Sequence, residues 1–189
     1  MFKKWLAMVT VLALLLPAAA LGESTALPFG LQFGMDKDQT LAAFDADATL
    51  GKLKYDTDDY DNGAIEYNFE DIVIPGTDLT ADSLSVQVDQ NNSAKTDKLT
   101  SVGFVMDSVD NSIATFRSLL KTMSATLGAP ESDPFSADAT NTYVEWGTLD
   151  AAWTLADGRV SLSLSRMYEE SISIQYTSRL NYDAADLAE

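Results

Sequence analysis

An acidic stretch at residues 56–63, with the sequence DTDDYDNG, could bind a cation, because clustered carboxylate oxygens are the ligands that calcium prefers. Aligning Gly63 with the invariant glycine of an EF-hand loop places a tyrosine at a ligand position and Phe69 where a bidentate glutamate belongs. The EF-hand pattern therefore fails. A solvated acidic hairpin that ends in an Asn-Gly turn is the better explanation. The alternative is an irregular calcium site built from Asp56, Asp58, Asp59 and Asp61.

Few residues of this chain could act as a nucleophile or as a general acid or base. The 189 residues include no His and no Cys, which excludes a histidine base, a thiol nucleophile and a zinc site with nitrogen or sulfur ligands. Ser118 and Lys121 match an S-x-x-K signature, but its S-D-N and K-T-G companions are missing. Two carboxylates suffice for glycoside hydrolysis, yet the sequence alone cannot select a pair among 29 acids.

Trp146 and Trp153 are the tryptophans that follow the N-terminal leader, and both fall in segments where apolar and polar residues alternate. Such alternation predicts strands with one buried face, so packing of both rings in the core is the favoured interpretation. If no helix covered that face, the same two rings would form an exposed aromatic patch, which is typical of a binding surface for a partner.

The charge balance restricts the partners. Twelve Lys plus Arg against 29 Asp plus Glu give a formal net charge of −17, which repels phosphate backbones and anionic lipid. We therefore expect no nucleic-acid partner. A hydrophobic fraction of 46% is ordinary for a globular domain.

The N-terminus has the three parts of a secretory signal peptide: Lys3 and Lys4, an uncharged run from Trp5 to Leu16, and small residues after Pro17. We predict a signal peptide at residues 1–22 and a single α+β domain at residues 23–189. Because the chain has no Cys, no acylated cysteine can anchor the mature protein to a membrane. Export without disulfides indicates a periplasmic or extracellular protein of bacterial type.

The second half predicts one helix followed by an antiparallel meander. Apolar residues recur at helical spacing over residues 111–127, with Asp110 as the expected N-cap and Gly128 after the last turn. The period then changes to two, and we expect strands at residues 143–149, 151–156, 159–167 and 171–179. Their expected apolar face consists of Val144, Trp146, Trp153, Leu155, Val160, Leu162, Leu164, Ile172, Ile174 and Tyr176.

Turn signals give the register of this meander. An Asp157-Gly158 turn pairs Trp153 with Leu162, and a three-residue loop at 168–170 pairs Leu164 with Ile174. A further turn at 150–151 separates the first two strands. Ser161, Ser163, Ser173 and Gln175 then point away from the apolar face.

The first half repeats this plan. A short helix at residues 36–44, with Asp36 as its cap, precedes strands near residues 64–69, 83–88 and 100–106. The tetrapeptide Ala-Thr-Leu-Gly occurs after both helices, at 48–51 and 125–128. A duplication into tandem halves, 27–107 and 108–180, and a chance match both explain it.

Two motifs carry a resemblance to a known group. The segment Phe33-Gly34-Met35-Asp36-Lys37-Asp38 is similar to the helix start G-M-[ST]-x-x-[EQ]-[VA], and Leu127-Gly128-Ala129-Pro130 is similar to an L-G-x-P exit. The chain thus resembles the small exported α+β domains grouped around the β-lactamase inhibitor protein and the outer-membrane assembly lipoproteins of the SmpA/OmlA type. Asp36 stands where Ser or Thr is usual, and the cysteine pairs and lipid anchor of some members are missing.

The resemblance implies a helix that leads into an antiparallel sheet, sometimes in tandem, and a role in protein binding rather than catalysis. It assigns no functional residue to this chain. We therefore expect a non-catalytic exported protein, without a cofactor, that binds another envelope or extracellular protein. A hydrolase or carbohydrate-active protein that uses carboxylates and an acidic calcium-binding protein are the alternatives.

Overall fold

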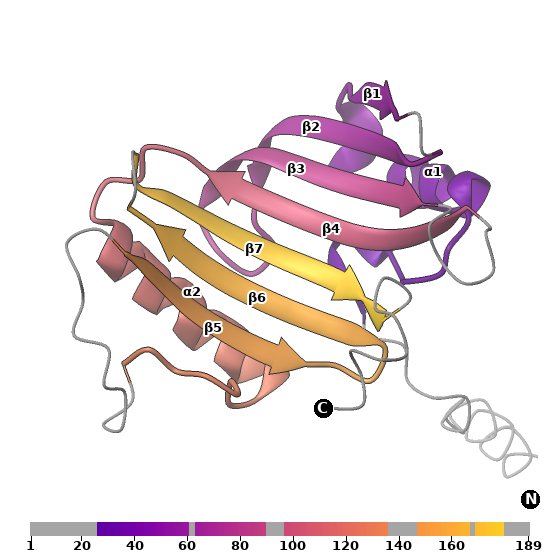
Figure 1. The fold of residues 1–189 in the computed structure, drawn as a ribbon. Helices are drawn as coiled ribbons and strands as arrows, with labels where there is room; N and C mark the ends of the chain where they lie inside the picture. The colour runs from indigo at the N-terminus through magenta and orange to yellow at the C-terminus, as the bar shows by residue number, and fades with distance from the viewer. Residues whose placement is uncertain (1–25, 61–62, 90–96, 136–146, 167–168, 180–189) are drawn as a thin grey trace, which may run out of the picture.

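The computed structural model describes residues 26–60, 63–89, 97–135, 147–166 and 169–179 of the chain. The predicted signal peptide, Trp146 and Asp61 lie outside the described residues. Within these ranges the chain forms two α-helices and one seven-stranded antiparallel sheet (Figure 1). The prediction of an α+β fold with an antiparallel sheet is therefore confirmed.

Each helix precedes its own run of strands. Helix α1 (Lys37–Ala46) lies between the 3₁₀ turns η1 (Pro28–Gly30) and η2 (Leu50–Lys52), and it precedes β1 (Asp56–Asp59), β2 (Ile65–Val73), β3 (Thr80–Asp89) and β4 (Lys98–Met106). Helix α2 (Ser112–Leu127) precedes β5 (Thr148–Thr154), β6 (Gly158–Ser165) and β7 (Ser171–Ser178). The order across the sheet is β1-β2-β3-β4-β7-β6-β5, so the two runs join where β4 pairs with β7. Neither helix of the described chain is long and apolar enough to span a membrane.

The helix ends follow the sequence signals in part. The Asp36 side chain accepts a hydrogen bond from the Gln39 backbone N–H at 2.9 Å, and Gln39 Oε1 accepts from the Asp36 N–H at 3.0 Å. This capping box confirms Asp36 as the N-cap of α1. The expectation of Asp110 as the N-cap of α2 is wrong. Asn111 holds that position in the left-handed region, with φ 54°, which Asn tolerates better than most residues. Gly128 follows the last turn with φ 88°, as expected.

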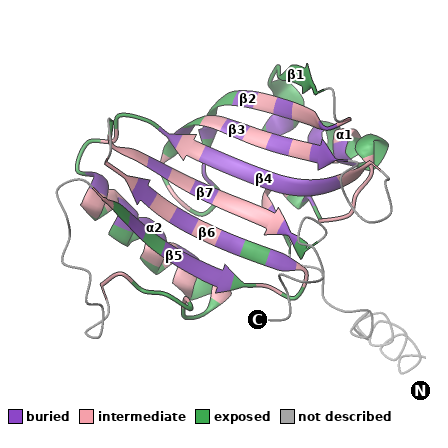
Figure 2. Ribbon diagram, in the orientation of Figure 1, coloured by how far each residue is buried: buried purple, intermediate pink, exposed green. Residues whose placement is uncertain are grey.

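One hydrophobic core lies between the helices and one face of the sheet. Residues directly opposite one another on neighbouring strands form continuous apolar rows, and Phe44 of α1 and Phe116 of α2 belong to the same cluster. Figure 2 shows the resulting alternation of buried and less buried residues along the strands. One row that crosses six strands contains Trp153, Val160, Tyr176, Val102, Val86 and Tyr67.

The turn predicted at residues 150–151 is wrong, because β5 runs straight through it from Thr148 to Thr154. Leu149, Ala151 and Trp153 fall on one face of a single period-two strand and are all buried. A type I′ hairpin turn requires positive φ at both central residues, and Ala151 does not readily take it, so continuing the strand costs less. The described part of the meander therefore has three strands, and residues 143–146 lie outside the described residues.

The predicted registers are also wrong, each by two residues. Trp153 pairs with Val160 instead of Leu162, because the Leu155 N–H bonds the Gly158 carbonyl at 2.8 Å and the turn falls at 156–157. Leu164 pairs with Ile172 instead of Ile174, since the loop that follows β6 is longer than predicted. Because side chains alternate along a strand, a shift of two residues leaves every side chain on its predicted face. The predicted apolar face is therefore unchanged by these two errors in register.

Tyr67 is the one described residue whose buried side-chain polar atom has no hydrogen-bond partner. Its ring packs edge-on against Phe44 at 5.5 Å between centroids, and burial raises the pKa of its hydroxyl. A buried hydroxyl without a partner loses its bonds to water and gains none in return. We expect Tyr67→Phe to raise the free energy of unfolding by about 1 kcal/mol in urea titrations. A loss of stability in Tyr67→Phe would show instead that the hydroxyl is bonded in solution.

Candidate binding face

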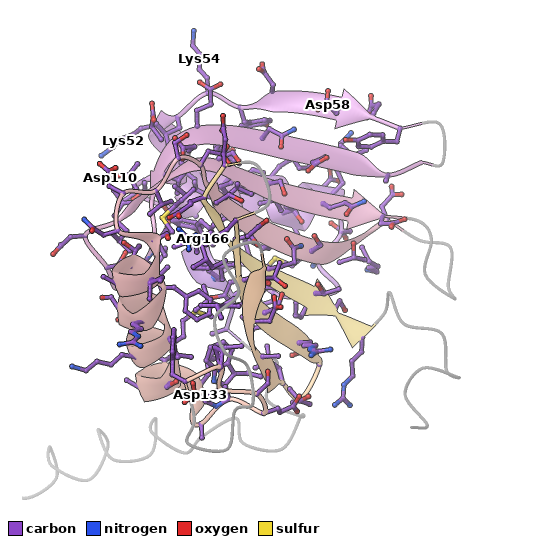
Figure 3. All side chains as sticks on the ribbon, turned by 60° about the vertical axis from the view of Figure 1, so that its left-hand side comes forward. Lys52, Lys54, Asp58, Asp110, Asp133 and Arg166 are labelled. Atoms are coloured by element: carbon purple, nitrogen blue, oxygen red, sulfur yellow. The ribbon has the colours of Figure 1, made fainter. Side chains whose placement is uncertain are left out.

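The second face of the sheet is polar and is not covered by α1 or α2. Figure 3 shows α2 against the other side of the strands, and Asp58 on β1 at the far edge of the sheet from that helix. Along β6 and β7, buried core residues alternate with residues that point to this second face. The prediction that four residues point away from the core is confirmed for Ser161, Ser163, Ser173 and Gln175. We call this surface the open face. By register it contains Asp56, Asp58, Glu66, Asn68, Glu70, Ser83, Ser85, Gln87, Ser101, Gly103, Val105, Thr148, Asp150, Ala152, Thr154, Arg159, Ser161, Ser163, Ser165, Ser171, Ser173, Gln175 and Thr177.

In the middle of the open face, a long side chain lies over a glycine. Gln175 of β7 donates from Nε2 to Ser101 Oγ of β4 at 2.8 Å. Its Oε1 atom lies 2.4 Å from the position that a Cβ would occupy on Gly103. A side chain at position 103 would displace the Gln175 amide from this position.

A shallow groove of about 300 Å³ occupies the β5 end of the open face. Gly128 ends α2 and Pro130 follows it, and the chain then returns along β5, where the Glu131 N–H donates to the Ala152 carbonyl at 2.7 Å. Ser132 thereby forms one wall of the groove. Asp150, Arg159 and Gln175 are among its other lining residues. Among the described residues, Asp150 is the one carboxylate that lines the groove, whereas glycoside hydrolysis needs two.

Trp153 lies in the core and not on the open face. Its side chain is only 2% exposed, and its Nε1–H donates to the Gly128 carbonyl at 2.9 Å. Phe116 and Met123 of α2 belong to the same cluster, as the core interpretation expected. For Trp153 an exposed aromatic binding patch is therefore wrong, because α2 covers this face. Trp146 lies outside the described residues.

The first four residues of the acidic stretch form the exposed edge strand β1. Asp56 and Asp58 fall on the open face, whereas Asp59 alternates to the opposite face of β1. The Asn68 amide donates to Asp58 Oδ2 at 3.1 Å. In the described part of the chain, no three acidic residues are grouped so as to hold a metal ion. The calcium interpretation stays a prediction, with Asp61 outside the described residues.

A serine, a carboxylate and an arginine meet beside the N-terminus of α2. The Ser112 hydroxyl donates to Glu170 Oε2, and Arg166 donates to Glu170 Oε1 and forms an ion pair with it. The hydrogen bond from Ser112, which has the larger effect, and the hydrogen bond from Arg166 hold the pKa of Glu170 below its ordinary value. A carboxylate stabilised in this way is a poor base, and Ser112 is 2% exposed, so the group does not form a nucleophilic site. Instead it ties α2 to the loop between β6 and β7. The partners lie 58 residues apart, and no sequence signal marks the pair.

This contact predicts a pH dependence of stability. Because folding lowers the pKa of Glu170, its stabilisation is present above the ordinary value of 4.5 and is lost as pH falls through the lower folded value. We expect wild type to be more stable than Glu170→Gln at pH 7 and the difference to shrink below pH 4.5. Thermal melts from pH 7 to pH 3 measure it, with Glu169→Gln as the control at an exposed neighbour. An equal difference at both ends of the pH range would contradict the contact.

Ser118 is exposed on α2, which confirms that this part of the S-x-x-K match faces solvent. The groove could not be found from the sequence, because Ser132 and Gln175 come from segments that only the folded sheet brings together.

Searches against protein-family models, curated proteins and solved structures find no significant match to the chain.

Proposed function

We propose that this chain is an exported, non-catalytic protein that binds another protein through the open face. The observation that carries the proposal is a broad polar sheet face that no described helix covers, on a sheet whose other face packs against the hydrophobic core. At about 4.8 Å between strands and about 3.4 Å per residue, the seven strands give a face of roughly 900 Å². Each partner in a protein interface of standard size contributes roughly 800 Å².

The side chains of the open face suit binding. Eight of its residues are serines: Ser83, Ser85, Ser101, Ser161, Ser163, Ser165, Ser171 and Ser173. A serine hydroxyl both donates and accepts hydrogen bonds and has little rotamer freedom to lose when a partner orders it. The regular strands beneath also hold these hydroxyls in place before binding, which reduces the entropic cost of association.

Export, the lack of catalysis and an internal duplication are proposed from the sequence and from the order of the elements. The leader at residues 1–22 supports export to the periplasm or the extracellular space, and N-terminal sequencing of the recovered protein should begin at Glu23. The absence of His and Cys supports a non-catalytic role. The helix-then-strands order of both halves, joined at β4 and β7, supports an internal duplication. The resemblance to exported binding domains points in the same direction.

Tryptophan substitutions on the two sides of the molecule test the proposal. Ser163→Trp places a large ring on the open face, whereas Ser118→Trp places the same ring on the exposed side of α2. The immobilised mature protein and both variants are incubated with the exported proteins of the source organism, with calcium and with chelator. We expect wild type and Ser118→Trp to retain the same stoichiometric protein and Ser163→Trp to lose it.

Circular dichroism serves as the folding control for both variants. Equal retention by Ser163→Trp and wild type would exclude the open face as the binding surface. Retention only in the presence of calcium would favour the calcium-binding alternative.

A further inference from the structure

Charge is distributed unevenly across the sheet. Strands β4, β5, β6 and β7 contain two cations, Lys98 and Arg159, and one acid, Asp150. Strands β1, β2 and β3 contain no Lys or Arg and eight acids, namely Asp56, Asp58, Asp59, Glu66, Glu70, Asp71, Asp82 and Asp89. One end of the sheet is therefore strongly negative, and the other end is nearly neutral.

Four of these acids lie on the open face. Asp58 pairs directly with Glu66, and Asp56 and Glu70 lie on the same side of β1 and β2. Asp56, Asp58 and Glu70 are exposed. Neighbours hold two of the carboxylates in place, because the Tyr60 hydroxyl donates to Glu66 Oε2 at 2.6 Å and Asn68 donates to Asp58. We call Asp56, Asp58, Glu66 and Glu70 the acidic end of the open face.

We propose that the partner of the open face is a basic protein surface, with its Lys and Arg side chains over the acidic end and an uncharged polar region over the serines of β6 and β7. This inference rests on the proposed function and specifies the partner's chemistry. Placing cations over prepositioned carboxylates speeds the encounter and fixes one orientation of the partner. Approach in the reverse orientation would set the partner's cations against Arg159 in the groove.

The other occupants of this face fit the charges less well. A second copy of the chain would bring together two chains that each have a formal net charge of −17 over their full sequence. Nucleic acids and anionic membranes would be repelled in the same way. A basic protein is therefore the occupant that the open face favours.

The test compares two double variants that remove the same charge. Asp58→Asn with Glu66→Gln neutralises the acidic end and keeps side-chain oxygens that can accept the bonds from Asn68 and Tyr60. Asp38→Asn with Asp45→Asn removes two exposed charges from α1, on the other side of the sheet. The first probe is a fluorescent decalysine peptide, with decaglutamate as its negative control, measured by anisotropy at about 50 mM and 200 mM salt.

We expect the acidic-end variant to weaken decalysine binding by about fivefold at low salt and the α1 variant by less than twofold, with no decaglutamate binding. Equal weakening in both variants would show that net charge alone attracts the peptide, and it would overturn the inference. The second arm repeats the capture of the exported partner with the same variants. Loss of the partner in the acidic-end variant and its retention in the α1 variant is the expected result.

Failure of the inference is distinguishable from failure of the proposed function. If Ser163→Trp loses the partner and the acidic-end variant keeps it, the open face binds a protein but not through a basic surface. If both variants keep the partner, the proposed function fails as well. Binding of anionic vesicles or nucleic acid to the open face, measured with the same variants, would also overturn the inference.

Discussion

Replacing Trp153 with alanine is expected to lower the free energy of unfolding by about 3–5 kcal/mol. The ring is 2% exposed in the core between β5 and α2, and its removal leaves a cavity that the rigid sheet cannot close. The substitution also leaves the Gly128 carbonyl without the indole donor, just where α2 ends. Urea titration followed by far-UV circular dichroism measures the loss.

Trp153→Phe is the matched control. It keeps most of the apolar volume and removes the hydrogen bond to Gly128, so we expect a smaller loss, about 1–2 kcal/mol. A loss below about 1 kcal/mol in Trp153→Ala would mean that the ring is not packed against α2. Trp153 would then be better explained as part of an exposed aromatic patch.

Replacing Phe44 with alanine is expected to cost about as much, 3–5 kcal/mol, at the opposite end of the molecule. The Phe44 ring is 2% exposed and contacts three aromatic rings, those of Tyr55, Tyr67 and Phe69, at centroid distances of 5.7, 5.5 and 5.0 Å. It is the largest fully buried side chain of α1, so its loss also weakens the docking of that helix. Urea titration measures the loss, with Phe44→Leu as the control that retains most of the apolar volume.

Because one cluster spans both ends of the sheet, Phe44→Ala and Trp153→Ala should both leave a single cooperative transition. Two separate transitions in either variant would contradict a continuous core. The halves would then unfold independently.

Local signals in the sequence predict the element types and faces well. Apolar residues at helical spacing mark α2, and Asp36 as an N-cap marks the start of α1. Alternation of apolar and polar residues fixes which side of each strand faces the helices. Registers are harder to predict, because turns at 156–157 and 157–158 give the same faces and differ only in how neighbouring strands pair.

Contacts between distant segments account for the errors. Gly158 carries a strong turn signal, yet it is the first residue of β6, where a Cβ would meet the Thr177 carbonyl oxygen at 2.3 Å and the Phe33 ring at 2.7 Å. The need for glycine there comes from packing that the sequence does not display. The arrangement of the open face likewise depends on contacts that the sequence does not display. The acids at 56–59 suggested a metal, whereas their role on the sheet depends on β2 beside them.

We propose that a protein partner binds the open face and not the helix side. Because the chain contains no Cys, a single cysteine carries a photo-crosslinker at one known position. Labelled Ser163→Cys and Ser118→Cys proteins are irradiated with the captured partner, and the crosslinked product is measured by mass spectrometry. We predict strong crosslinking from position 163 and little from position 118. Strong crosslinking from position 118 with none from position 163 would place the partner on the helices and contradict the claim.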